Sequence, residues 1–155
     1  LEGTGDVCTA THCVVEHAHV KRTVKLCIAI SRAKFLVSCA WAEACEQQHA
    51  LVPEAPFALS GTFSSAPGAA SKWSFDAQLS LERAAAGPCL AGCAFLLTSS
   101  VKPPPSDLAL ILEAAGGKVL KRLPPTPTGD EHVAYYAVSC PQDKAASTAL
   151  KKQGH

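Results

Sequence analysis

Short apolar runs with two different periods alternate along the first fifty positions. His12–Val15 and Phe35–Val37 contain mainly β-branched and large apolar residues, which is typical of strands. Between these runs, the apolar residues of Val24–Ile30 cover nearly the whole circumference of a helix. We therefore predict two short strands and, between them, a short helix that is buried on more than one side.

A second helix is predicted directly after the second strand. Ser38 is a suitable N-cap residue, and Trp41, Ala44 and Cys45 recur at helical spacing, as the buried stripe of a helix ending near His49. Trp41 is expected to anchor the core, because an indole buries a large apolar area. Strand, helix, strand and helix joined by short loops predict an α/β fold, with a parallel sheet flanked by helices.

The last third of the chain repeats this alternation. Ala94–Leu97 is predicted to be a buried strand, and Ser106 is predicted to cap a helix that Gly116 and Gly117 end. The apolar stripe of this helix comprises Leu108, Ile111, Leu112 and Ala115. The other elements predicted here are strands over Lys118–Leu120 and Tyr135–Ser139 and a helix around Ala145–Lys152.

A linker separates the two patterns. Prolines, serines and glycines accumulate over Val52–Gly68, and one helix is predicted over Ser74–Ala86, where Gly87 and Pro88 stop it. This organisation predicts three parts, with boundaries at 1–59, 60–92 and 93–155.

The composition is that of a globular protein with a core of its own. Of the 155 residues, 48% are hydrophobic and 17% are charged, and no apolar run approaches the roughly 18 residues of a membrane span. The net charge of +1 argues against general electrostatic attachment to nucleic acid or membrane. The eight cysteines lie mostly among apolar residues, so we expect reduced, intracellular thiols.

Metal binding and catalysis lack their sequence signatures. Cys8, Cys13, His17 and His19 could supply four ligands, but their spacing is not that of a structural zinc site. The common catalytic motifs, such as the P-loop and the nucleophile elbow, do not occur in the sequence. We therefore expect no metal, no other cofactor and no enzyme activity.

Positive charge gathers where the first predicted helix begins. Lys21, Arg22 and Lys25 lie there, although the positive end of a helix dipole disfavours cations and attracts anions. An external anion would resolve this conflict: Lys25 and the free amides of the first turn could hold a phosphate, and Arg22 a carboxylate or a peptide carbonyl. Two alternatives are that these are solvated loop cations, or that the basic cluster over residues 21–34 binds DNA.

The order of these motifs resembles a tandem pair of BRCT repeats. Thr11–Val15, Arg22–Lys25, Phe35–Ser38 and Trp41 are similar to the latter half of one repeat, which would make 1–59 its C-terminal part. By the same resemblance, 93–155 would be the N-terminal part of a following repeat. The motifs similar to that second repeat are the linker helix, Phe95–Thr98, the helix after Ser106 with Gly116, Gly117, Lys118 and Val119, and Val138–Asp143.

Tandem BRCT pairs of this kind recognise phosphorylated proteins. The resemblance implies a nuclear module of the DNA-damage response whose partner contains phosphoserine or phosphothreonine, with Lys25 and Thr23 on the phosphate and Arg22 on the peptide. The family's Ser/Thr-Gly phosphate ligands would precede Leu1, which implies an incomplete pocket in this chain. The remaining implied positions are Cys27, Lys102 and Pro103 in a peptide groove between the repeats, and Trp41, Gly116 and Gly117 in the structural core.

Overall fold

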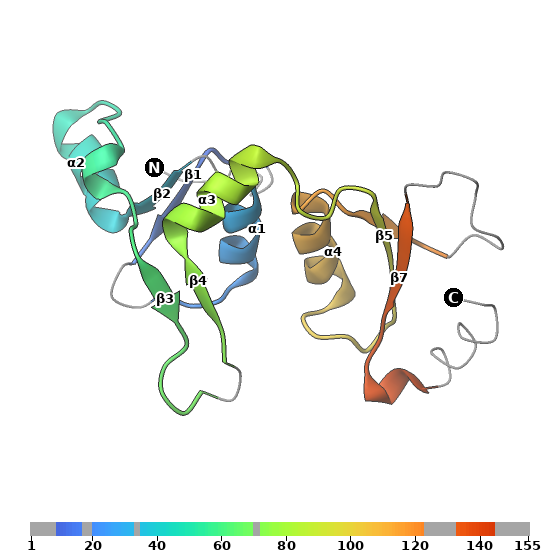
Figure 1. Ribbon diagram of the computed structural model, residues 1–155. Coiled ribbons are helices and arrows are strands. Elements are labelled where there is room, and N and C mark those ends of the chain that lie inside the picture. The colour runs from blue at the N-terminus through green and yellow to red at the C-terminus, as the bar shows by residue number, and fades with distance from the viewer. Residues whose placement is uncertain (1–8, 17–19, 33–34, 70–71, 123–132, 145–155) are drawn as a thin grey trace. The chain divides into compact units, whose positions relative to one another are not determined.

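The computed structural model describes residues 9–16, 20–32, 35–69, 72–122 and 133–144. The chain divides into two compact units, Leu1–Gly87 (unit 1) and Pro88–His155 (unit 2), whose helices and strands are shown in Figure 1. Within the described ranges, no helix is both long and apolar enough to cross a membrane.

Unit 1 is built on a pair of parallel strands. β1 (His12–Val15) pairs with β2 (Phe35–Ser38), with His12 opposite Phe35. The connection between the strands contains α1 (Val24–Arg32), and α2 (Cys39–Gln48) follows β2 directly. Parallel strands joined through a helix are the arrangement predicted from the hydrophobic pattern, and that prediction is confirmed.

Helices cover both faces of this strand pair. Leu36 and Val37 are adjacent on β2, so their side chains point to opposite faces, and both are completely buried. Leu36 packs in a cluster with Ala29 of α1, Leu59 and Ala77. Val37 packs in a second cluster with Trp41 and Cys45 of α2 and Val52. Figure 1 accordingly shows α2 on one side of the strands and α1 on the other.

The predicted helix over Ser74–Ala86 is wrong for its first three residues. β4 (Ser74–Asp76) pairs antiparallel with β3 (Thr62–Ser64), and α3 (Ala77–Ala86) begins only after this hairpin. Phe75 lies opposite Phe63, and the two rings stack with centroids 5.5 Å apart. This cross-strand aromatic pair favours a strand over a helix at Phe75. The side chain of Asp76 then caps α3 by accepting a hydrogen bond from the Leu79 N–H at 2.8 Å.

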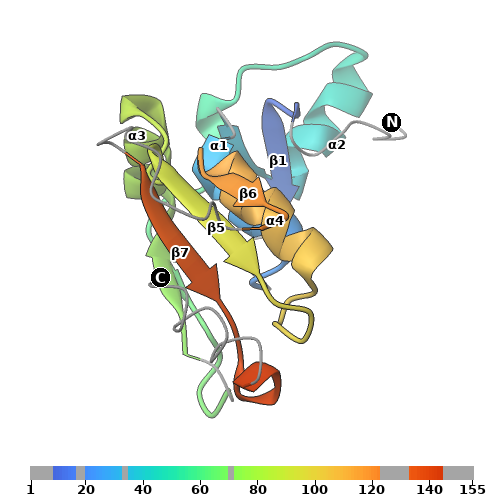
Figure 2. The same ribbon diagram turned by 90° about the vertical axis from the view of Figure 1, so that its right-hand side faces the viewer.

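Unit 2 contains a three-stranded parallel sheet. β5 (Cys93–Leu97) is central, with β6 (Lys118–Leu120) and β7 (Ala134–Val138) on either side, as Figure 2 shows. α4 (Pro105–Ala114) connects β5 to β6 and packs against β6, and the short helix η3 (Pro141–Asp143) follows β7. The α/β class predicted for the last third of the chain is therefore confirmed.

The start of α4 differs from the prediction. The helix begins at Pro105 with Pro104 as its N-cap, so the prediction that Ser106 caps it is wrong. Proline suits the first helical position, because its φ is already helical and its missing N–H would have no partner there. The other end is as predicted, since Gly116 follows the helix with a φ of 90°.

Several sequence expectations fall outside the described residues. The predicted helix around Ala145–Lys152 is one of these, and so are Cys8, His17 and His19, which were weighed as metal ligands. Within the described part, no group of three or more potential metal-ligating side chains is found.

Candidate functional site

Thr23 holds the start of α1. Its hydroxyl oxygen accepts a hydrogen bond from the Leu26 N–H at 3.2 Å, and its carbonyl oxygen accepts one from the Cys27 N–H at 3.0 Å. This is the geometry of an N-cap, which satisfies one of the N–H groups that a helix start leaves free. The N–H groups of Val24 and Lys25 come before the first helical carbonyl that could pair with them, so the positive end of the helix dipole lies at this site.

Two exposed cations flank this cap. Within the described part of the chain, Lys25 forms no ion pair with an acid. Burial raises the pKa of the Cys13 and Cys27 thiols above the ordinary value of 9.0, so both cysteines are neutral thiols at physiological pH. The positive charge of Lys25 offsets part of this rise at Cys13, and that of Arg22 offsets part of it at Cys27.

The structure thus brings together four of the residues expected at the site. Arg22, Thr23, Lys25 and Cys27 all lie in the first turn of α1 or directly before it, and Lys25 also acts on β1 through Cys13. The arrangement offers one cation, a capped helix start and a second cation within one turn of helix. Such a set of donors is suited to a small, doubly charged anion.

Lys102 and Pro103 lie in unit 2, in the loop between β5 and α4. Lys102 lines a cavity of about 460 Å³, together with Ser100, Val101, Val138, Ser139, Cys140 and Gln142. Cys27 belongs to unit 1, so a groove shared by Cys27 and Lys102 stays a prediction.

The sequence patterns do not point to the carboxylate that lies beside this cavity. One oxygen of Asp143 accepts hydrogen bonds from the Thr98 hydroxyl at 2.5 Å, the Ser100 N–H at 3.0 Å and the Cys140 thiol at 3.4 Å. The other oxygen accepts one from the Ser100 hydroxyl at 2.7 Å. The bonds from Thr98 and Ser100 are the main cause that lowers the pKa of Asp143 to about 2.

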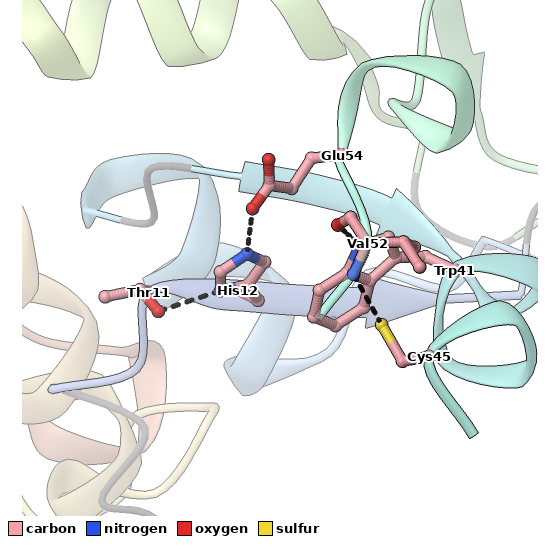
Figure 3. A network of polar contacts seen from close by, with 6 residues as sticks. All are labelled: Thr11, His12, Trp41, Cys45, Val52 and Glu54. Atoms are coloured by element: carbon pink, nitrogen blue, oxygen red, sulfur yellow. Dashed lines mark hydrogen bonds and ion pairs between the residues drawn. The ribbon is translucent and has the colours of Figure 1, made fainter. Parts of the chain in front are cut away.

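His12 was also missed as an interacting residue. Its imidazole stacks against Phe35 and Trp41, with ring centroids 4.8 and 4.6 Å away. Its Nε2 lies 3.0 Å from the Glu54 carboxylate and its Nδ1 lies 2.8 Å from the Thr11 hydroxyl, as Figure 3 shows. The hydrogen bond to His12 lowers the pKa of Glu54.

Trp41 joins α2 to the segment that follows it. The indole is 7% exposed, and its Nε1–H donates to the Val52 carbonyl at 3.0 Å (Figure 3). The Val52 N–H lies 3.5 Å from the Cys45 sulfur, which it can reach as a weak acceptor. These contacts give Trp41 a structural role, in keeping with the core position expected for it.

Gly116 and Gly117 stand where a side chain would collide with neighbours. A Cβ at Gly116 would lie 2.3 Å from the Cβ of Pro88, and one at Gly117 would lie 2.8 Å from Cε2 of Phe95. Gly116 also needs its left-handed φ of 90°. Both positions therefore serve the turn between α4 and β6 rather than a ligand.

Unit 2 has the sequence of a known family. Residues 88–155 match the BRCT domain family, and this part of the chain is therefore a BRCT domain. The resemblance to BRCT repeats that the motifs indicated is confirmed by this match.

Known proteins are similar to this chain over most of its length. PAX-interacting protein 1 of Bos taurus is 36% identical over 114 residues, which are 74% of this chain and 11% of that protein. Mediator of DNA damage checkpoint protein 1 of Homo sapiens is 26% identical over 139 residues, which are 90% of this chain and 6% of that protein. The chain thus spans only a small part of these relatives.

A solved structure shows the same fold. The crystal structure of the BRCT5–BRCT6 domains of S. pombe Brc1 matches with a TM-score of 0.58 and 20% sequence identity. The match covers 94% of this chain and 69% of that one. The fold of this chain is therefore similar to that of a tandem BRCT pair.

Proposed function

We propose that this chain is a non-catalytic module that binds proteins carrying phosphoserine or phosphothreonine, and that it works in the nucleus in the DNA-damage response. The BRCT domain and the similarity to mediator of DNA damage checkpoint protein 1 support a protein-interaction role in this setting. The single observation that carries phosphate binding is the exposed Lys25 at the Thr23-capped start of α1, where no acid of the described residues pairs with it.

The Lys25 ammonium is the main phosphate ligand. It donates charge-assisted hydrogen bonds to a dianionic phosphate, and the helix-start amides of Val24 and Lys25 add donors under the positive end of the helix dipole. Because Thr23 uses its hydroxyl as an acceptor in the cap, the hydroxyl hydrogen can be donated to a phosphate oxygen.

Arg22 sets the register of the peptide. Its side chain binds a carboxylate or peptide carbonyl of the ligand, three residues beyond the phosphorylated one, and Cys27 contributes the apolar surface beside it. Lys102 and Pro103 are the proposed contacts in unit 2. An unphosphorylated peptide leaves Lys25 and the helix start without their anion, which is the basis of discrimination.

Peptide titration tests this mechanism. A degenerate library of phosphoserine peptides selects a ligand, and fluorescence anisotropy compares that ligand with its dephosphorylated form. We expect Lys25→Met to weaken binding of the phosphorylated form roughly ten- to hundredfold, since a hydrogen bond to a charged group is worth about 1.5–3 kcal/mol.

Lys118→Met is the matched control, because Lys118 is an exposed lysine at the start of β6 in unit 2. Equal affinity for the phosphorylated and dephosphorylated peptides, or unchanged binding by Lys25→Met, would rule the mechanism out. Binding to a DNA duplex with a steep salt dependence, and no binding to the phosphopeptide, would instead favour the DNA-binding alternative.

A further inference from the structure

Three residues at the end of β5 and the end of β7 direct hydrogen-bond donors at one point. Thr98 and Ser100 follow β5, and Cys140 precedes η3. Their two hydroxyls, one backbone N–H and one thiol all reach the carboxylate of Asp143, at distances between 2.5 and 3.4 Å. All four donors are neutral.

The hydrogen of the Thr98 hydroxyl belongs to this cluster. Oγ1 of Thr98 lies 2.5 Å from the Asp143 carboxylate and 3.3 Å from the Val138 carbonyl, and a hydroxyl has only one hydrogen to donate. The Val138 carbonyl already accepts the Thr98 N–H at 3.0 Å. The shorter contact to the carboxylate therefore takes the hydroxyl hydrogen, so the Thr98 hydroxyl joins the Ser100 hydroxyl, the Ser100 N–H and the Cys140 thiol as donors to this anion.

Hydroxyls and a backbone N–H that converge on one anion are the donors that proteins use for phosphate as well as for carboxylate. We propose that Thr98, Ser100 and Cys140 form an oxyanion cradle in unit 2, and that Asp143 occupies this cradle as an internal ligand in place of a phosphate. The depressed pKa of Asp143 agrees with this arrangement, because the donors favour its charged form.

A vacated cradle would be reachable from outside. The cavity of about 460 Å³ beside it is lined by Ser100 and Cys140, which are cradle residues, and by Lys102 and Gln142. Lys102 is exposed and carries a positive charge at this cavity. The ligand class for the vacated cradle is thus inorganic phosphate or a phosphorylated side chain.

The internal ligand has a consequence for partner recognition, which rests on the proposed function of unit 1. While Asp143 is seated, unit 2 takes no phosphate at this place, so a partner is held through one phosphorylated residue at α1. The Asp143 carboxylate then acts as a specificity-determining group, since it repels a second phosphate by its charge and by its occupancy of the donors.

Inorganic phosphate is the probe for this cradle, applied to the full chain with Asp143→Ala. We expect the Ser100 amide signal in a ¹H–¹⁵N correlation spectrum to shift saturably with phosphate in this variant and to stay unmoved in the unchanged chain. At a concentration ten times its dissociation constant, phosphate should also shift the folding equilibrium of the variant about elevenfold toward the folded state. This shift is measured as a rise in Tm.

Three further variants make the outcome unambiguous. Adding Lys25→Met removes phosphate binding at α1, so the Ser100 signal reports unit 2 whether or not the proposed function of unit 1 holds. Asp107→Ala removes another acid of unit 2, in the first turn of α4, and should give no response. If Asp143→Ala does not fold, Asp143→Asn keeps the shape of the side chain, and folding that returns on addition of phosphate supports the cradle.

The proposal fails on either of two results. One is a folded Asp143→Ala variant whose Ser100 amide does not respond to phosphate, or an unfolded Asp143→Ala variant whose folding phosphate does not restore. The other is a response of equal size in the unchanged chain, which would show that Asp143 does not occupy a phosphate position.

Discussion

The start of α1 and the end of β5 both gather hydrogen-bond donors, but they differ in where the anion comes from. At α1 the donors include the charged Lys25, and no acid of the described residues pairs with it. At β5 the donors from Thr98, Ser100 and Cys140 are neutral, and the chain's own Asp143 fills them. One site is thus open to a ligand, and the other is closed by an internal one.

This difference shows what makes donors available for binding. A nearby carboxylate can accept hydrogen bonds from neutral hydroxyls and amides without any repulsion between like charges. These hydrogen bonds then favour the ionised form of the carboxylate. A lysine at the positive end of a helix is satisfied only by an anion that also meets the helix dipole. In this chain the first set is satisfied within the fold, and under the proposed function the second set binds a partner.

Removal of the Trp41 indole is expected to have the largest effect on stability. It should destabilise unit 1, which contains the open site, and leave the stability of unit 2 unchanged. Trp41 is buried in unit 1 against His12 and Val52, so Trp41→Ala should lower the free energy of unfolding of unit 1 by about 3–5 kcal/mol. Chemical denaturation followed by residue-resolved amide signals measures Lys25 and Ser100 separately.

Leu51→Ala is the control for this substitution, because Leu51 is 79% exposed and its truncation should change stability by no more than about 0.5 kcal/mol. An equal loss at Ser100 in Trp41→Ala would show that the two units unfold as one, and that the two sites do not rest on separate scaffolds.

A smaller effect is expected from a methyl group at Gly116, in the unit that contains the closed site. Gly116→Ala combines a left-handed backbone, which costs roughly 1–2 kcal/mol, with overpacking against Pro88, which costs roughly 1–3 kcal/mol. Gly61→Ala in unit 1 is the matched control, because Gly61 has a φ of 86° and open space around the position of a Cβ. Thermal unfolding of both variants should show the larger loss for Gly116→Ala. Equal losses would mean that Pro88 moves aside freely.

The smallest expected effect is the loss of stability of each unit in acid. The folded-state pKa of Asp143, about 2, lies below its ordinary value of 3.8, so its ionisation stabilises unit 2 above pH 3.8. This contribution disappears as the pH falls from 3.8 to about 2. The pKa of Glu54 in unit 1 is likewise lowered from 4.5, by its hydrogen bond to His12, and its contribution is lost in the same direction.

Denaturation of Asp143→Asn at a series of pH values measures the Asp143 part of this acid dependence. In that variant, unit 2 should no longer lose stability between pH 3.8 and about 2, whereas the loss in unit 1 through Glu54 should persist. An unchanged acid dependence of unit 2 would contradict the role given to the Asp143 hydrogen bonds.

Local patterns in the sequence were sufficient for most of the elements outside the β3–β4 hairpin. The period of the apolar residues predicted β1, α1, β2 and α2 within a few residues, and the glycines after α4 marked its end. The cations before and within the first turn of α1 could also be found in this way, because Arg22, Thr23 and Lys25 are neighbours along the chain. Interactions between residues three or four positions apart can be predicted directly from the order of residues in the sequence.

Contacts between distant segments escaped that reasoning. The local pattern predicts a helix at Phe75. Phe75 lies in a strand instead, because its pairing with Phe63 in another strand outweighs the local preference. Glu54 is 42 residues from His12, in a proline-rich segment with no pattern that points to an imidazole. The sequence around His12 does not indicate a contact with Glu54, and the sequence around Glu54 does not indicate one with His12.

The closed site at β5 is the clearest case of a feature that only the tertiary structure decided. The motif that ends in Asp143 was visible in the sequence, but its partner Ser100 lies 43 residues earlier, and the parallel pairing of β7 with β5 brings the two strand ends together. The sequence alone determined which donors and acids exist and which elements carry them. Which acid meets which donors depended on strand register, because register fixes the distances between groups that are far apart along the chain.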